Sequence, residues 1–146
     1  NSFKNLNKFE NIFLKFQILE GIINTNQSKV IWDKNLEIEL EENYIFIEDG
    51  IIRLNGLVNL SVLDYKKFYS VFQTSKELRK KFTKIKLNFN YNFLTNELNI
   101  DNFYVDDKYS ESINQYLKNT NKENNNIKNW VDFKKYINKI IFSYSG

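Results

Sequence analysis

The strongest constraint on the fold is a strict alternation of apolar and polar residues between Lys84 and Leu94. The even positions from Lys84 to Asn92 are polar, and the apolar residues at odd positions are Ile85, Leu87, Phe89, Tyr91 and Phe93. Because successive side chains of a β-strand point to opposite faces, this pattern predicts a long strand with one apolar and one solvated face. At about 3.3 Å per residue, a strand over residues 83–94 would span on the order of 40 Å.

The same alternation continues on both sides of this strand. Asn96 and Glu97 predict a turn, after which Leu98 to Val105 forms the returning strand of a hairpin. Upstream, Glu48, Asp49 and Gly50 predict a second hairpin turn, which leads into a strand that begins at Ile51. Further strands are expected over residues 12–18, 30–32, 36–40 and 44–47.

Gly56 falls inside the strand that begins at Ile51, where glycine is unfavourable unless it has a local role. We therefore expect a bulge or a close backbone approach at this position. Together these segments predict a mainly β (α+β) fold, in which six or seven antiparallel strands form a meander or curved sheet.

Helices are expected at two places. Asp64 is suited to cap a helix over Tyr65–Phe72, and Ser75 is suited to cap a short helix over Lys76–Phe82. Residues 110–118 are weakly helical. The last segment, from about Asn129 to Tyr144, has apolar residues on one helical stripe, namely Trp130, Phe133, Ile137, Ile140, Ile141 and Tyr144.

The predicted elements divide the chain into three regions. Residues 1–106 form the antiparallel β region with short helices at about 64–82. Residues 107–128 form a polar linker, which includes an asparagine-rich loop over 119–126. Residues 129–146 form the C-terminal amphipathic helix.

The composition excludes most enzymatic chemistry. The 146 residues include no Cys and no His, so disulfides, zinc sites, thiol nucleophiles and imidazole bases are ruled out. No GxSxG, P-loop or GxGxxG motif occurs, and four glycines are too few for a phosphate-binding loop. Glu37, Glu39 and Glu41 alternate with apolar residues, which is typical of the solvent side of a sheet. We expect no catalytic residue, metal or cofactor.

The net charge of +3 hides two opposed blocks. Residues 33–50 carry seven acidic residues and one Lys, whereas residues 64–86 carry eight basic and two acidic residues. The basic block can contact an anionic partner, and the candidate residues are Lys76, Arg79, Lys80 and Lys81. Nucleic-acid binding is not expected, because the aromatic residues of the following strand lie on the face opposite its lysines.

Several segments resemble AsmA-like proteins of the bacterial cell envelope. Residues Leu57–Gln73 are similar to a strand in that family that leads into a helix with an initial Asp, a Phe–Tyr pair and a Phe–Gln pair. The resemblance continues through Arg79-Lys80-Lys81, Ile85–Tyr91 and Leu98–Asn102, and it returns in the helix from Trp130. These motifs are structural, and they carry no catalytic signature.

The resemblance implies the C-terminal part of a large protein that is anchored in the inner membrane by an upstream helix and extends on the periplasmic side. Its body would be a long curved sheet with an apolar groove for phospholipid acyl chains, which supports lipid transport or outer-membrane biogenesis. A chain that begins at Asn1 is expected for such a piece. The candidate lipid-facing residues are Leu54, Val58, Leu60, Val62, Ile85, Leu87, Phe89, Tyr91 and Phe93.

A second interpretation remains open from the sequence. The chain would be a structural or assembly module that caps a longer β-sheet and contacts an envelope protein through its basic block. In that case the helices cover the apolar faces of the sheet. A nucleic-acid-binding domain is the least favoured of the three interpretations.

Overall fold

The computed structural model describes residues 9–120 and 125–144. They form one antiparallel sheet and helices, which confirms the predicted fold class. The strands are β1 (Phe9–Phe13), β2 (Gln17–Leu19), β3 (Ile22–Asn24), β4 (Ser28–Trp32), β5 (Leu36–Glu48), β6 (Ile51–Val62), β7 (Lys84–Asn92), β8 (Glu97–Val105) and β9 (Lys108–Tyr109). The helices are α1 (Tyr65–Phe72), the 3-10 helix η2 (Lys76–Leu78), α2 (Glu111–Thr120) and α3 (Trp130–Ser143).

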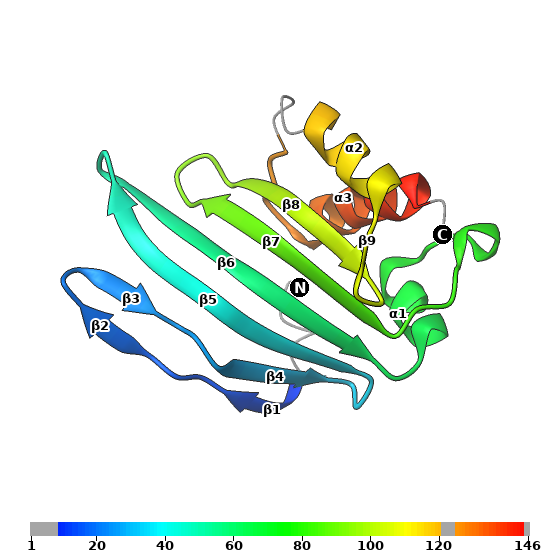
Figure 1. Ribbon diagram of the computed structural model, residues 1–146, viewed down its shortest axis with the longest axis horizontal. Coiled ribbons are helices and arrows are strands. Elements are labelled where there is room, and N and C mark those ends of the chain that lie inside the picture. Colours follow the sequence, from blue (N-terminus) through cyan, green and yellow to red (C-terminus); the bar gives the residue numbers. More distant parts are fainter. Residues whose placement is uncertain (1–8, 121–124, 145–146) are drawn as a thin grey trace.

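The strands follow the order β1-β4-β5-β6-β7-β8-β9, and the β2–β3 ribbon joins the sheet where β3 pairs with β5. The long strands β5 to β8 lie in chain order, as a meander requires (Figure 1). The predicted turn at Glu48–Gly50 is confirmed, since β5 ends at Glu48 and β6 begins at Ile51. Asp49 and Gly50 both have positive φ, at 51° and 75°, which matches the twist of a tight hairpin.

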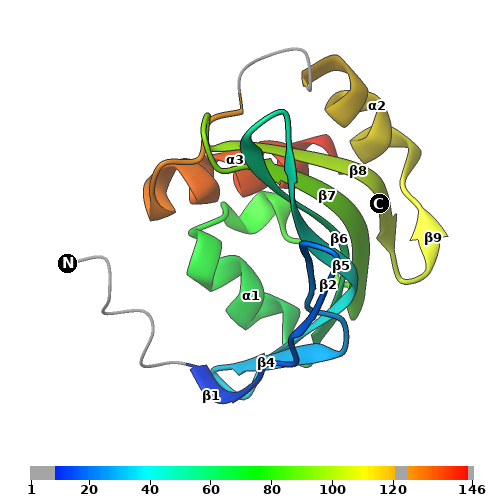
Figure 2. The same ribbon diagram turned by 90° about the vertical axis from the view of Figure 1, so that its left-hand side faces the viewer.

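The sheet is open and curved, and α1 and α3 lie inside its curve (Figure 2). We call the face toward these helices the concave face and the opposite face the convex face. The concave face carries the apolar positions of each strand. One row across it is Val30, Ile38, Leu60, Ile85 and Val105, which are partners in successive strands.

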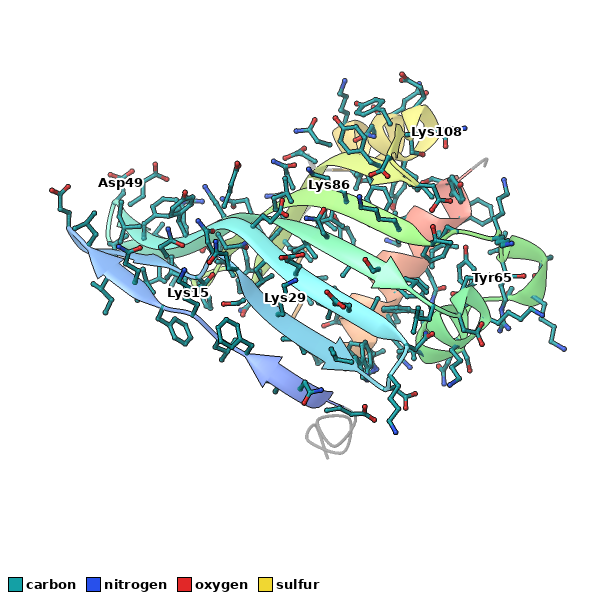
Figure 3. All side chains as sticks on the ribbon, turned by 60° about the horizontal axis from the view of Figure 1, so that its bottom comes forward. Lys15, Lys29, Asp49, Tyr65, Lys86 and Lys108 are labelled. Atoms are coloured by element: carbon teal, nitrogen blue, oxygen red, sulfur yellow. The ribbon has the colours of Figure 1, made fainter. Side chains whose placement is uncertain are left out.

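The convex face carries most of the polar positions, together with a few apolar residues such as Ile31 and Leu57. Its residues include Lys29, Glu39, Asn59 and Lys86, which form one register row. Lys29 and Lys86 are labelled in Figure 3. The Lys29 ammonium lies 3.2 Å from the Glu39 carboxylate and 3.7 Å from that of Glu37. The alternating glutamates of β5 are therefore a solvated face of the sheet, as their spacing predicts.

A β-bulge in β5 lies opposite Gly56. The register shifts between Glu41 and Tyr44, and the buried Asn43 side chain lies over Gly56. Asn43 Nδ2 donates to the carbonyl oxygens of Glu41 and Leu57, at 2.6 and 3.0 Å. Gly56 is therefore next to a bulge and a close approach, as its position in the strand predicts. The bulge lies in β5 and not in β6, and the close approach is made by the Asn43 side chain and not by backbone.

Several predicted elements differ in extent. The strands expected over 36–40 and 44–47 are one bulged strand, β5, and Glu97 lies in β8 instead of in the turn. Among the described residues the sheet has nine strands, where six or seven are expected. Residues 12–18 do not form one strand, because the chain between β1 and β2 leaves the ladder and Lys15 N donates to Ser28 Oγ at 3.0 Å. The helix expected over Lys76–Phe82 is limited to η2, and the backbone at Arg79 is already extended. Both Nε and a terminal nitrogen of Arg79 donate to the Thr74 carbonyl, at 2.9 and 2.7 Å, which holds the chain in this path.

The helices that the sequence predicts at 65–72 and 129–144 are confirmed as α1 and α3. The region predicted as a polar linker, 107–128, contains β9 and α2, and α2 packs against β8 and α3. Part of the predicted loop over 119–126, namely 121–124, lies outside the described residues, as do residues 145–146.

Candidate functional site

A cavity of about 340 Å³ lies between the concave face and the helices. Its walls are apolar side chains throughout, apart from the hydroxyl groups of two tyrosines and the indole of Trp32. The sheet contributes Trp32, Leu36, Ile38, Val58, Leu60, Ile85, Leu87, Phe89, Leu98, Ile100, Phe103 and Val105. The remaining wall consists of Phe68, Tyr69, Phe72, Phe82, Ile113, Phe133, Ile137, Ile140, Ile141 and Tyr144.

Local sequence explains how each wall forms. The strands present every second residue to the concave face, so their alternation places aliphatic and aromatic side chains there and polar ones on the convex face. On α3, Phe133, Ile137, Ile140 and Ile141 share one stripe because they recur at three- and four-residue spacing. The two amphipathic patterns enclose a space of the size and character of small-ligand sites, about 300–1,000 Å³.

The structure separates the predicted lipid-facing residues into three groups. Five line the cavity, namely Val58, Leu60, Ile85, Leu87 and Phe89. Val62 is 4% exposed and belongs to the buried core, as Ile85 and Leu87 do, but unlike them it does not line the cavity. Leu54, Tyr91 and Phe93 lie on the same face, farther along the sheet from the helices.

The concave face continues beyond the cavity as an uncovered apolar surface. Leu98, which lines the cavity, pairs with Tyr91, and Tyr91 pairs with Leu54. The helices cover one end of the sheet, and the end near the β5–β6 turn projects past them (Figure 1). We call this part the open end, and its residues Ile47, Ile52 and Phe93 are 68%, 47% and 46% exposed.

The cavity carries no ionised group of its own. Burial raises the pKa of Tyr69 to about 12, although a hydrogen bond to the Lys80 carbonyl opposes the shift. Burial also raises the pKa of Tyr144, and the nearby Asp106 charge adds to the effect. Both phenols are therefore neutral at physiological pH, which suits an apolar occupant.

The four predicted anionic-partner residues have different environments. The Arg79 guanidinium donates two hydrogen bonds to the Thr74 carbonyl oxygen. Lys76 and Lys81 are exposed, whereas Lys80 is half-buried and its Nζ lies 5.2 Å from the centre of the Tyr144 ring. Of the four, Lys80 is thus the one that contacts a wall of the cavity.

The two edges of the sheet differ. The outer side of β8, which we call the β8 edge, is covered. The two-residue strand β9 pairs with Tyr104 and Val105, and next to it Phe103 N donates to Asn114 Oδ1 at 2.9 Å and Asn114 Nδ2 donates to Phe103 O at 2.8 Å. Farther along, Leu98 N donates to Asn125 O and Ile127 N to Asn96 O, at 3.1 and 2.7 Å. At the other edge, no described segment pairs with the outer side of β1 or β2.

The open edge also exposes large apolar side chains on both faces. Those more than half exposed along β1, β2 and the segment between them are Ile12, Phe13, Leu14, Phe16, Ile18 and Leu19. An edge strand that is unpaired on its outer side and has this composition is a template for pairing with another β-strand.

Sequence reasoning missed much of the cavity wall. Ile38 and Ile100 belong to strands whose alternation was recognised, so the same pattern indicates that they share the face. Trp32 shares the face of Val30 by the same alternation in β4, whereas no local signal links Phe82 to the site. The Trp32 ring contacts Trp130 of α3, with ring centres 5.9 Å apart, and the Phe82 ring lies 5.2 and 5.6 Å from the rings of Phe68 and Tyr69 of α1.

Among residues 9–120 and 125–144, no group of three or more acidic, His or Cys side chains is placed to hold a metal ion. In that part of the chain there is also no helix with the length and hydrophobicity needed to cross a membrane. Comparisons with protein-family models, with curated proteins and with solved structures found no match to this chain.

Proposed function

We propose that this chain is a non-enzymatic part of an AsmA-like protein of the bacterial cell envelope, which supports lipid transport or outer-membrane biogenesis. In this role the concave face binds lipid acyl chains. The proposed location is the periplasmic side of the envelope, with membrane anchoring by regions outside this chain.

The observation that carries the proposal is the continuity of the cavity with the open end of the concave face. An acyl chain needs an elongated apolar surface, and the row of Leu54, Tyr91 and Leu98 joins the two parts of that surface. At about 25 cal/mol per Å² of buried apolar area, covering such a surface with hydrocarbon is favourable without any polar contact.

The test is to purify the chain, extract bound material for lipid mass spectrometry, and titrate the delipidated protein with the apolar fluorophore N-phenyl-1-naphthylamine. Val58→Trp places an indole in the cavity. The expected result is co-purified lipid in the wild type and probe affinity reduced about tenfold or more in the variant.

Asn59→Trp is the matched control, because Asn59 is the next residue of β6 and points to the convex face. Circular dichroism checks that both variants fold. The proposal would be overturned if the wild type co-purifies without lipid and if Val58→Trp and Asn59→Trp bind the probe with the same affinity as the wild type.

One observation favours a second candidate, a module that caps a longer β-sheet. The β8 edge is covered by Asn114 and residues 125–127, whereas the β1–β2 edge is open and apolar. A domain with one sealed and one open edge can end a sheet that continues on its open side. This candidate is compatible with acyl-chain binding, and the whole-molecule prediction below tests it.

A further inference from the structure

Lys80 places a positive charge beside the cavity. The residue lies between Arg79, which is bound to Thr74, and Phe82, whose buried side chain lines the cavity. The Tyr69 hydroxyl donates to the Lys80 carbonyl at 2.9 Å, so a cavity-lining side chain holds the backbone here. The Lys80 ammonium then lies over the ring of Tyr144, another wall residue.

The contact that the structure gives this ammonium is an aromatic ring. No carboxylate among the described residues lies within ion-pair distance of it. The Asp106 carboxylate, whose charge acts on Tyr144, has hydrogen-bond partners elsewhere. Its Oδ1 accepts from Thr83 N, Thr83 Oγ1 and Lys84 N at 2.8 to 2.9 Å. A half-buried cation beside an apolar space favours an anion more strongly than a fully solvated cation does.

We infer that the cavity binds a single-chain anionic amphiphile, with the hydrocarbon chain among the apolar walls and the carboxylate or phosphate at the Lys80 ammonium. The inference rests on the proposed function and specifies its ligand. The volume of about 340 Å³ is at the small end of ligand sites, which favours one chain over two. The Tyr144 ring, between cavity and ammonium, marks where chain and headgroup meet.

The neighbouring basic residues provide the comparison. Lys81 is adjacent in sequence, carries the same charge and is exposed. Arg79 is unsuitable as a control, because its guanidinium holds the backbone after Thr74. A general attraction of the basic block for anions would depend on Lys80 and Lys81 alike, whereas a headgroup site depends on Lys80.

The experiment compares three ligands of equal chain length by isothermal titration calorimetry: palmitate, 1-palmitoyl lysophosphatidate and the uncharged methyl palmitate, each below its aggregation concentration. The proteins are the wild type, Lys80→Gln and Lys81→Gln. We expect Lys80→Gln to weaken binding of at least one anionic ligand by about tenfold, and to leave methyl palmitate unchanged. The anionic ligand that loses more identifies the headgroup as carboxylate or phosphate.

The outcomes separate the two proposals. If all three ligands bind the wild type equally, or if Lys81→Gln has the same effect as Lys80→Gln, the Lys80 site is wrong and acyl-chain binding stands. If methyl palmitate binds and the anionic ligands do not, the inference is also overturned. If none of the three binds, both the inference and the proposed acyl-chain function fail.

Discussion

At the scale of single residues, Gly56 decides how β5 and β6 can pack. A Cβ at this position would lie 1.8 Å from Asn43 Oδ1 and 2.3 Å from its Cγ. Asn43 cannot move away easily, since it is fully buried and its Nδ2 bonds two carbonyl groups. The missing side chain of Gly56 therefore leaves the space that the Asn43 side chain occupies at the bulge.

Gly56→Ala is expected to destabilise the protein by about 1–3 kcal/mol, the usual cost of forcing extra volume into a packed site. The measurement is the free energy of unfolding from urea titration, with Ser61→Ala in the same strand as the control. The double variant Gly56→Ala/Asn43→Ala should cost less than the sum of the two single variants, because truncating Asn43 removes the clash. Strict additivity would contradict the proposed contact.

Asp106 is the residue whose charge should matter for stability at low pH. Burial alone would raise its pKa, but hydrogen bonds from Thr83 and Lys84 and the Lys108 charge outweigh burial and lower it. A lowered folded-state pKa stabilises the protein at pH values above the unfolded pKa, about 3.9 for Asp. That contribution is lost as the pH falls through the lower folded-state value.

We expect the stability difference between the wild type and Asp106→Asn to be constant above roughly pH 5 and to shrink below roughly pH 4. Urea unfolding at a series of pH values measures it. A difference that does not change with pH would show that the ionised carboxylate contributes nothing.

At the scale of elements, α1 depends on Asp64 in two ways. The carboxylate caps the helix by accepting from Lys66 N and Lys67 N, at 2.8 and 3.4 Å. The Asp64 backbone exchanges two hydrogen bonds with the Asn35 side chain, at 2.6 and 3.0 Å, which ties the helix start to the turn between β4 and β5. Because α1 supplies Phe68 and Phe72 to the cavity, this junction also positions the cavity wall.

Asp64→Ala should cost about 1 kcal/mol of unfolding free energy, the typical value of an N-cap, and Asp64→Asn should retain most of it. Chemical denaturation of both variants provides the measurement. Equal destabilisation by Ala and Asn would mean that capping is not the source of the effect.

The cap of α1 was predictable because it depends on residues within three positions. The path of residues 79–82 was not, although Ser75 and the spacing of the following apolar residues are compatible with a helix. Phe82 is 3% exposed and Val62 N donates to Thr83 O at 2.8 Å, so the chain must extend to reach the start of β7. Those partners are distant in sequence, and they outweigh a weak local preference.

At the scale of the whole molecule, the asymmetry of the two sheet edges predicts self-association or strand addition. The β1–β2 edge combines unpaired backbone groups with apolar side chains, for example Ile18 and Leu19 at 73% and 66% exposed. Pairing with another strand lowers the free energy of such an edge, whereas the β8 edge already has its hydrogen-bond partners.

We expect the isolated chain to associate with increasing concentration, and Ile18→Lys to weaken that association by about tenfold or more. Sedimentation velocity over a concentration series measures it. Leu63→Lys is the control, since Leu63 is 86% exposed and lies outside the edge. A wild type that stays monomeric at every concentration would count against the capping role.

The sequence by itself determined the long strands, the face that most of their apolar residues share and the N-cap of α1, because side-chain direction and capping are set within a few residues. The tertiary structure decided which apolar residues enclose a cavity and which edge is covered. The hydrogen bond between Thr74 Oγ1 and Asn138 Oδ1 joins residues 64 positions apart, and it holds α3 beside the end of α1. No local sequence pattern specifies such a contact. It forms because the arrangement of α3 against α1 and the sheet has a lower free energy than other ways of packing the same elements.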